Sequence, residues 1–323
     1  MESMDIKKVL LVGIGSLVVS TILTYVFIPI LKKLKVGQEV REEGPESHYG
    51  KSGTPTMGGV IIAMIIFIFT LIFVKKDYKV ILTLIAMMGF GLIGFLDDAE
   101  KMQKKQSLGL TPKQKLILQF ALAFIILIVA YFMDQDLIKY INIPFVDKLI
   151  NISVVSIPLL AFIMVGTVNA VNLTDGLDGL LVGVSLPVFA TLTLFAIYLK
   201  EYNMSLISIV AFGSLCGFLF FNSNPASIFM GDTGSMAIGG LISILSIFYN
   251  IPIYIAIFGG IYLIEALSVI IQVSHYKRTK KRVFLMSPIH HHFELKGHKE
   301  QKITVAFSII STILCALAII IFF

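Results

Sequence analysis

Apolar residues in this chain are gathered into blocks of about 20, a length that spans the hydrocarbon core of a bilayer. Of its 323 residues, 57% are hydrophobic and only 14% are charged. Ten blocks are predicted, at about 9–31, 57–74, 80–96, 116–133, 152–171, 177–199, 205–221, 234–249, 251–274 and 303–323. We therefore expect an all-α polytopic integral membrane protein with ten transmembrane helices, forming a single domain over residues 1–323.

The first block has an alternative interpretation as a signal peptide, because Lys7 and Lys8 precede it. It is longer than a signal core and no small-x-small cleavage site follows, so we interpret it as a helix. Between two later blocks, the Ile-Pro-Phe-Val pattern of segment 134–151 is consistent with a short hairpin. Cys216 and Cys315 lie inside apolar blocks and are interpreted as core residues, not as a disulfide or metal ligands.

Basic residues are distributed unequally between the two sets of loops that ten helices create. The loops after helices 1, 3, 5, 7 and 9 hold 18 of the 26 lysines and arginines, and the rest of the chain holds 8. By the positive-inside rule, the first set faces the cytoplasm. Every polar cluster that could take part in catalysis or binding falls in that set, so we expect one active site on the cytoplasmic face. The formal charge of +6 suits basic loops or an anionic substrate, and no nucleic-acid signature accompanies it.

Four groups able to bind an ion or a phosphate recur every third residue between two apolar blocks: Asn169, Asn172, Asp175 and Asp178. On a helical backbone this spacing keeps them on one face. Carboxylates at the edge of a bilayer need a partner or a metal ion, because burying an unpaired charge is expensive. Gly176 would let backbone approach a ligand closely. The alternative is a polar loop capped by Asn and Asp side chains.

Two further acidic motifs lie at the ends of apolar blocks. Asp97 and Asp98 can hold a hard cation, act as base or nucleophile, or form ion pairs, and Lys101 would share their side of a continuing helix. Asp232 stands between glycines just before a block. The free N–H groups at the start of that helix would suit a diphosphate, and the Asp232 carboxylate would suit a Mg²⁺ ion. The alternative for Asp97 and Asp98 is a solvated helix end with an ion pair, and the alternative for Asp232 is an ordinary helix N-cap.

A run of three histidines, His290, His291 and His292, precedes the last block. Adjacent residues of a regular element point in different directions and zinc sites usually have wider spacing, so donors to a phosphate or to a leaving oxygen are favoured. The basic segment 277–282 attracts anions or anchors the chain at the membrane, and the two roles are compatible. Glu265 lies inside the ninth block, either as a functional carboxylate or as a partner for another helix.

Five motifs together resemble those of the polyprenyl-phosphate N-acetylhexosamine-1-phosphate transferases. They are Gly53-Thr-Pro-Thr-Met-Gly-Gly59, Asp97-Asp98-x-x-Lys101, Asn169 to Gly179, Phe229 to Ser235, and Pro288 to Glu294. They occur in the family's order from about Lys51 to the last block, and that family has ten helices. The unbroken His run followed by Phe-Glu resembles the branch that uses UDP-N-acetylmuramoyl-pentapeptide, whereas the N-acetylglucosamine branch tends to have a broken run.

The resemblance implies a reaction and a location. Undecaprenyl phosphate would attack the β-phosphorus of UDP-N-acetylmuramoyl-pentapeptide, giving UMP and the first lipid-linked peptidoglycan precursor, with Mg²⁺ as cofactor. The enzyme would be a homodimer in the bacterial cytoplasmic membrane. The same chemistry on UDP-N-acetylglucosamine is the nearer alternative. An ion transporter is the other alternative, but it predicts polar residues spread through the bilayer centre rather than gathered at one face.

The resemblance also implies roles for individual residues. The implied catalytic residues are Asp97, Asp98, Asp232 and His290, with Asp232 as the metal ligand. The implied substrate-binding residues are Lys51, Lys101, Asn172, Asp175, Asp178, Asn222, Phe229, Gln272, His291 and His292, with Phe229 able to stack on uracil.

Two roles for Asp97 are open. It would either form a covalent phospho-aspartate or help to deprotonate a lipid phosphate that attacks directly. The second pKa of a phosphate is about 6, so at neutral pH the phosphate is already largely a dianion and a base has little to do. We favour direct attack, with Asp97 orienting groups or binding metal.

Overall fold

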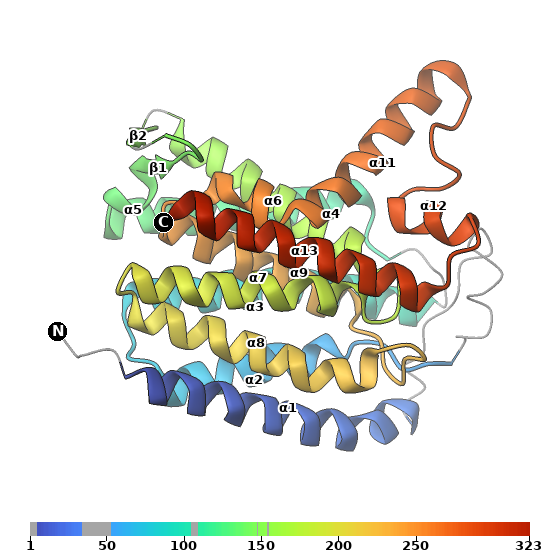
Figure 1. Cartoon of the computed structure of the whole chain (residues 1–323), viewed down its shortest axis with the longest axis horizontal. Coiled ribbons are helices and arrows are strands. Elements are labelled where there is room, and N and C mark those ends of the chain that lie inside the picture. The colour runs from blue at the N-terminus through green and yellow to red at the C-terminus, as the bar shows by residue number, and fades with distance from the viewer. Residues whose placement is uncertain (1–4, 34–52, 105–108, 147, 154) are drawn as a thin grey trace.

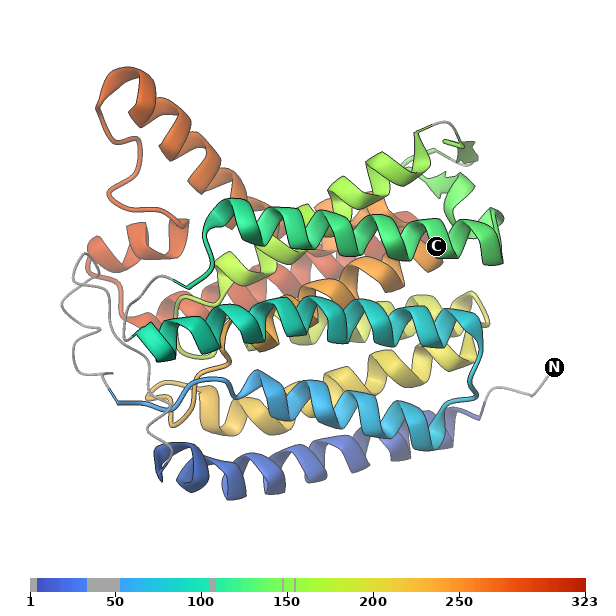
Figure 2. The ribbon, with the colours of Figure 1, turned by 180° about the vertical axis from the view of Figure 1, so that it is seen from behind.

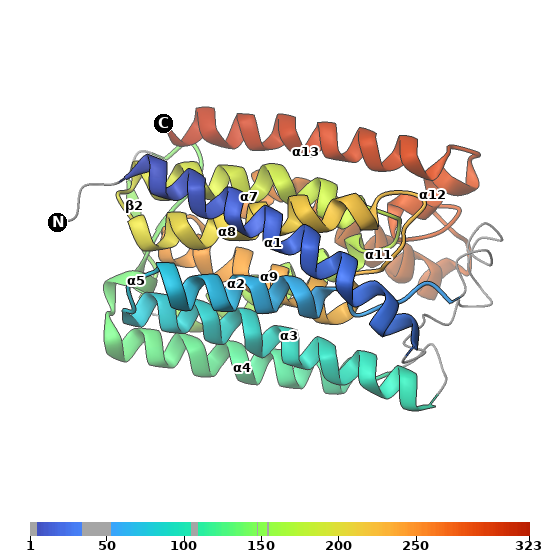
Figure 3. The ribbon, with the colours of Figure 1, turned by 90° about the horizontal axis from the view of Figure 1, so that it is seen from below.

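The computed structural model describes residues 5–33, 53–104, 109–146, 148–153 and 155–323. Its elements are α1 (Ile6–Lys33), α2 (Gly59–Phe73), α3 (Tyr78–Lys104), α4 (Pro112–Met133), α5 (Asp136–Lys139), β1 (Tyr140–Asn142), β2 (Leu149–Asn151), α6 (Ser156–Thr174), α7 (Leu180–Tyr198), α8 (Tyr202–Asn222), α9 (Gly231–Phe248), η2 (Pro252–Tyr254), α10 (Ile255–Phe258), α11 (Gly260–Thr279), α12 (Ile289–Leu295) and α13 (Glu300–Phe322). The long helices run along one axis in an elongated bundle (Figure 1). The start of α1 and the end of α13 lie at the same end of that bundle (Figure 3).

A multi-pass membrane architecture is confirmed, because a helix is found at each of the ten predicted blocks. Within the described ranges, eight helices are long and apolar enough to cross a bilayer, and the bent pair formed by 252–258 with α11 makes a ninth if it is counted as one span. The remaining apolar helix, α2, has only 15 residues, which is about 22 Å at 1.5 Å per residue. The number of ten spans therefore stays a prediction.

The block predicted at 251–274 is not one straight helix, so that expectation was wrong. The segments Pro252–Phe258 and Gly260–Thr279 meet at 87°. Gly259 and Gly260 stand together at the break, and glycine pairs are a usual cause of helix kinks. As a result α11 leaves the bundle and projects beyond it (Figures 1 and 2). The short helix α12, which carries the His run, was not predicted from the sequence.

Short elements cover the end of the bundle where α1 starts and α13 ends. The hairpin considered for 134–151 is present: β1 pairs with β2 in antiparallel fashion, with Tyr140 opposite Asn151. At the same end, Lys79 Nζ lies 2.6 Å from Glu201 Oε1. These contacts tie the connections between helices together far from the predicted active site.

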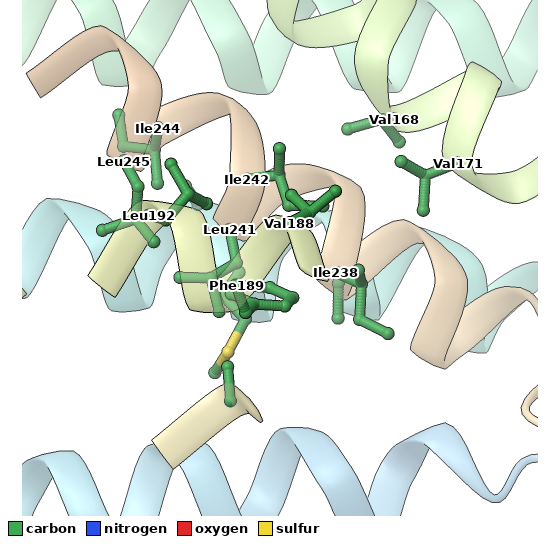
Figure 4. Packing of buried hydrophobic residues seen from close by; sticks show 14 of the residues in the cluster. Val168, Val171, Val188, Phe189, Leu192, Ile238, Leu241, Ile242, Ile244 and Leu245 are labelled. Carbon is green, nitrogen blue, oxygen red and sulfur yellow. The ribbon is translucent and has the colours of Figure 1, made fainter. Parts of the chain in front are cut away.

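Helix α9 is the centre of the bundle. In its candidate span, 89% of the residues are buried, against 22% in α13 at the periphery. It packs against α3, α6, α2 and α7, and Figure 4 shows side chains of α6, α7 and α9 meeting in one apolar cluster. Because lipid tails are as apolar as these side chains, close packing rather than exclusion of water stabilises such contacts. The packing fixes where α9 begins, and Asp232 lies at that point.

Candidate active site

Three carboxylates from distant parts of the chain meet where α3 ends and α9 begins. Asp97 and Asp98 stand on α3 and Asp232 in the first turn of α9, and one oxygen from each lies within 4.8 Å of the others. Gly94 makes this approach possible, because a Cβ atom there would be 2.2 Å from the Asp232 carbonyl oxygen. The two acidic motifs that were predicted separately therefore form one cluster.

Two lysines bridge the cluster. Lys101 Nζ lies 2.6 Å from Asp97 Oδ2 and 2.9 Å from Asp232 Oδ2. Lys115 Nζ, from α4, lies 3.1 Å and 2.7 Å from the same two oxygens. The position of Lys101 on the side of the acidic pair was predicted. Lys115 was missed, because nothing in the sequence distinguishes it from Lys113, which is exposed on the same helix.

Asp98 is engaged with the start of α9. Its Oδ1 accepts a hydrogen bond from the Asp232 N–H at 3.2 Å, and its Oδ2 accepts bonds from the Thr233 N–H at 3.0 Å and the Thr233 hydroxyl at 2.8 Å. A carboxylate is favoured there because helix starts carry unpaired N–H groups and a partial positive charge. These two N–H groups are therefore not free for a diphosphate, which corrects that part of the sequence interpretation.

The Asn–Asp stretch does not form one helical face. Helix α6 ends at Thr174, so Asp175 and Asp178 lie in the turn beyond it. Asn172 donates to Asp232 Oδ1 and to the Ser235 hydroxyl, both at 2.9 Å. Asn169 instead donates to Gln119 Oε1 at 2.7 Å. Only part of this stretch therefore faces the acidic cluster.

Asp178 holds the segment that precedes α9. Its Oδ2 accepts hydrogen bonds from the Ala226 N–H at 2.9 Å and from the Asn224 side chain at 3.1 Å, and its own N–H donates to Glu300 at 2.6 Å. Asn222, also buried, donates to the Ile228 carbonyl at 2.9 Å. Both residues, predicted to bind substrate, bond in this structure to the connection between α8 and α9.

The Gly-rich motif before α2 is joined to the same connection by backbone hydrogen bonds. The Phe229 N–H donates to the Pro55 carbonyl at 2.8 Å, and the Gly58 N–H donates to the Phe229 carbonyl at 2.9 Å. The ring of Phe229, predicted to stack on uracil, stays partly exposed. Lys51, predicted in the same motif, lies outside the described residues.

The three histidines lie on α12 with their side chains in different environments, as expected for adjacent helical positions. His290 is buried and its Nδ1 lies 3.0 Å from Glu265 Oε1. His291 Nδ1 lies 3.1 Å from Glu294 Oε2. His292 Nδ1 accepts a hydrogen bond from the Leu285 N–H at 3.1 Å, and loss of hydration lowers the pKa of its imidazole, with a further contribution from Lys296.

Gln272, on α11, braces the chain that leads to α12. Its side-chain oxygen accepts hydrogen bonds from the Val283 N–H at 2.9 Å and the Phe284 N–H at 3.0 Å, and its amide donates to the Phe284 carbonyl at 3.1 Å. Gln272, a predicted substrate-binding residue, therefore contacts a backbone segment and not the acidic cluster.

The donor set at the acidic cluster fits a hard divalent cation. Asp97, Asp98 and Asp232 are the group of three potential ligands found among the described residues, and carboxylate oxygens are what Mg²⁺ and similar ions prefer. The lysine contacts on Asp97 and Asp232 show that positive charge is favoured between those two carboxylates. The triple-His run does not form such a group within the described chain.

Comparison with known proteins identifies the family. The model of glycosyl transferase family 4 matches residues 80–250, and phospho-N-acetylmuramoyl-pentapeptide-transferase signature 1 matches residues 51–62. A phospho-N-acetylmuramoyl-pentapeptide-transferase of Caldicellulosiruptor bescii is 44% identical over 316 residues, covering 98% of each chain. That of Clostridioides difficile is 48% identical, covering 91% of this chain and 92% of its own. The chain belongs to the phospho-N-acetylmuramoyl-pentapeptide-transferase family.

The matched regions coincide with the parts that build the acidic cluster. The glycosyl transferase family 4 match contains Asp97, Asp98, Lys115, Asn172 and Asp232. The phospho-N-acetylmuramoyl-pentapeptide-transferase signature contains the backbone that pairs with the segment before α9. The resemblance read from the five motifs is thus confirmed at the level of the family.

Asp175 gives a prediction about pH. Loss of hydration, reinforced by the charges of Asp232 and Asp98, raises the pKa of its carboxyl from 3.8 to about 8. Between these two values the unfolded chain has lost the proton that the folded chain keeps, so stability falls as pH rises from about 4 and levels off above about 8. Asp175→Asn should remove this slope and gain stability over the wild type across the interval.

The measurement is the unfolding temperature of metal-free protein in detergent at pH 5, 7 and 9. The advantage of Asp175→Asn should grow with pH and be smaller than the pKa alone implies, because the side chain is partly exposed. Parallel pH curves for the two proteins would contradict the assignment.

Proposed function

We propose that this chain transfers phospho-N-acetylmuramoyl-pentapeptide from UDP-N-acetylmuramoyl-pentapeptide to undecaprenyl phosphate. An oxygen of the lipid phosphate attacks the β-phosphorus of the nucleotide sugar, the bond to the α-phosphate breaks, and UMP leaves. One phosphoanhydride replaces another, so catalysis consists mainly of positioning and charge neutralisation. The observation that carries the proposal is the cluster of three carboxylates and two lysines in a chain of this family.

Mg²⁺ is the cofactor that we propose, with Asp232 and Asp97 as the residues that would hold it. When bound, it would neutralise charge on the phosphates that exchange. Asn172 fixes Asp232 through its hydrogen bond to Oδ1, and Asp98 fixes the backbone of Asp232. Asp97 acts by binding and orientation in a direct attack, in keeping with its two lysine contacts.

The remaining predicted residues divide into two groups under this proposal. The residues proposed to bind substrate directly are Lys101, Asp175, Phe229, His290 and His291. Lys51, outside the described residues, is proposed to bind substrate from the family resemblance. Asp178, Asn222, Gln272 and His292 act mainly by holding backbone segments, as their hydrogen bonds indicate.

The topology proposed is ten spans in the bacterial cytoplasmic membrane, with α2 and the bent pair completing the eight long helices. The excess of basic residues in one set of loops supports placing the active site on the cytoplasmic side. A homodimer is proposed from the family resemblance alone.

The deciding experiment measures UMP release from UDP-N-acetylmuramoyl-pentapeptide by detergent-purified protein. Release should require both undecaprenyl phosphate and Mg²⁺ and should fall at least about 10²-fold in Asp232→Asn, which keeps the size of the side chain but loses its charge. Turnover of UDP-N-acetylglucosamine alone would assign the other branch. Stoichiometric UMP release without lipid, with label left on the protein, would show a covalent intermediate instead of direct attack.

Lys115 and Lys113 offer a matched pair on one helix. Lys115→Gln removes an ammonium group that lies between Asp97 and Asp232, and we expect kcat to fall about 10²-fold. Lys113→Gln changes an exposed side chain by the same chemistry and should leave kcat within about two-fold. Equal effects of the two substitutions on kcat would show that Lys115 acts only through net charge.

The orientation can be tested with single cysteines in a background lacking Cys216 and Cys315. Lys296→Cys, exposed just after α12, should react with a membrane-impermeant maleimide only after the membrane is opened. Asp136→Cys, exposed at the opposite end, should react in intact spheroplasts. The reverse pattern would invert the proposed topology.

A further inference from the structure

Glu265 is a carboxylate inside an otherwise apolar helix segment. Its exposed fraction is 0%, and it lies in α11 among lipid-facing neighbours such as Ile264 and Leu267. Its Oε1 lies 3.0 Å from His290 Nδ1, which is an ion-pair distance, and neither of its oxygens makes a hydrogen bond to the described residues. An unpaired carboxylate in such a place is expensive. The contact is therefore accounted for if His290 carries a proton on Nδ1, the ring nitrogen beside Glu265.

The other face of the His290 ring is fixed by the turn after α6. A Cβ atom at Gly176 would lie 2.1 Å from His290 Nε2, so only glycine leaves room for the imidazole there. Nε2 is buried, and the described part of the chain offers it no hydrogen-bond partner. The ring is thus held between Glu265 and the turn that carries Asp175.

Helix α12 depends on such contacts for its placement. It has seven residues, too few for a helix to be stable alone. Gln272 binds the backbone at Val283 and Phe284, and the next N–H, of Leu285, donates to His292. Unlike these contacts with the backbone, the Glu265–His290 contact joins two side chains.

We infer that Glu265 is a positioning residue for the proposed transfer reaction. It holds the His290 imidazole in the form with a proton on Nδ1, so that Nε2 carries the lone pair and can accept a hydrogen bond from a substrate hydroxyl or a protonated phosphate oxygen at the Gly176 turn. A carboxylate that orients a histidine in this way fixes both the tautomer and the ring direction. This inference rests on the proposed function and adds to it Glu265 as the residue that orients the His290 ring.

The kinetic test compares Glu265→Leu, Glu265→Gln and a control, Tyr262→Phe. The control removes a buried hydroxyl from the same helix, where it lies 2.8 Å from the Ser185 hydroxyl and away from His290. We expect kcat to fall about 10²-fold in Glu265→Leu with the KM for the nucleotide sugar nearly unchanged. Glu265→Gln, which still accepts a hydrogen bond from Nδ1, should recover part of the loss, and Tyr262→Phe should keep wild-type kcat.

A double-mutant cycle shows whether Glu265 acts through His290. In a His290→Ala background, Glu265→Leu should lower kcat no further. If the two substitutions instead lower kcat by independent factors that multiply, the inference is overturned. It is also overturned if Glu265→Leu unfolds at a far lower temperature than Tyr262→Phe and its kcat falls only in proportion to the amount of folded protein.

A measurement without turnover separates this inference from the proposed function. In protein with ¹⁵N-labelled histidine, one resonance should show a protonated Nδ1, be absent in His290→Ala and shift in Glu265→Leu. A His290 ring protonated only on Nε2 would overturn the inference even in an active enzyme. The expected resonance in a protein that releases no UMP from either nucleotide sugar would refute the function alone.

Discussion

The arrangement of charge at the start of α9 is the constraint on which the rest of the structure depends. Three carboxylates lie within 4.8 Å of one another, and such a group is stable at the edge of a membrane only where cations compensate it. Lys101 and Lys115 supply that compensation. Because one lysine comes from the end of α3 and the other from the start of α4, α3 has to end and α4 has to begin beside the first turn of α9.

Much of the fold was predictable because it is determined mainly by the apolar blocks, which can be located directly in the sequence. Long apolar blocks have to be helices where no water can satisfy the backbone, and a helix is found at every predicted block. The exception is instructive, since Gly259 and Gly260 mark a weak point in the ninth block without revealing that the chain turns by 87° there. The short helix α12 lay beyond prediction because tertiary contacts, not its own length, hold it in place.

The candidate site was predicted as a set of residues rather than as a set of roles. The sequence could place five polar clusters at one face because loops between helices have to lie at the ends of the bundle. It could not separate side chains of the acidic cluster, such as Asp232, from those that hold backbone segments by hydrogen bonds, such as Asp178 and Gln272. Both tasks use the same polar groups. The three-residue spacing of Asn169 to Asp178 was misleading because α6 ends at Thr174.

The two lysines also determine how the cluster responds to ligands. Three carboxylates and two ammonium groups leave one negative charge, so the cluster by itself attracts a cation. A divalent ion would reverse that sign to one positive charge, and the same place would then attract a diphosphate. Entry of the cation would also loosen the hold of the carboxylates on Lys101 and Lys115, freeing both ammonium groups for phosphate oxygens. The ion pairs that hold the cluster together would thereby impose an order of binding, with the cation first and the anion second.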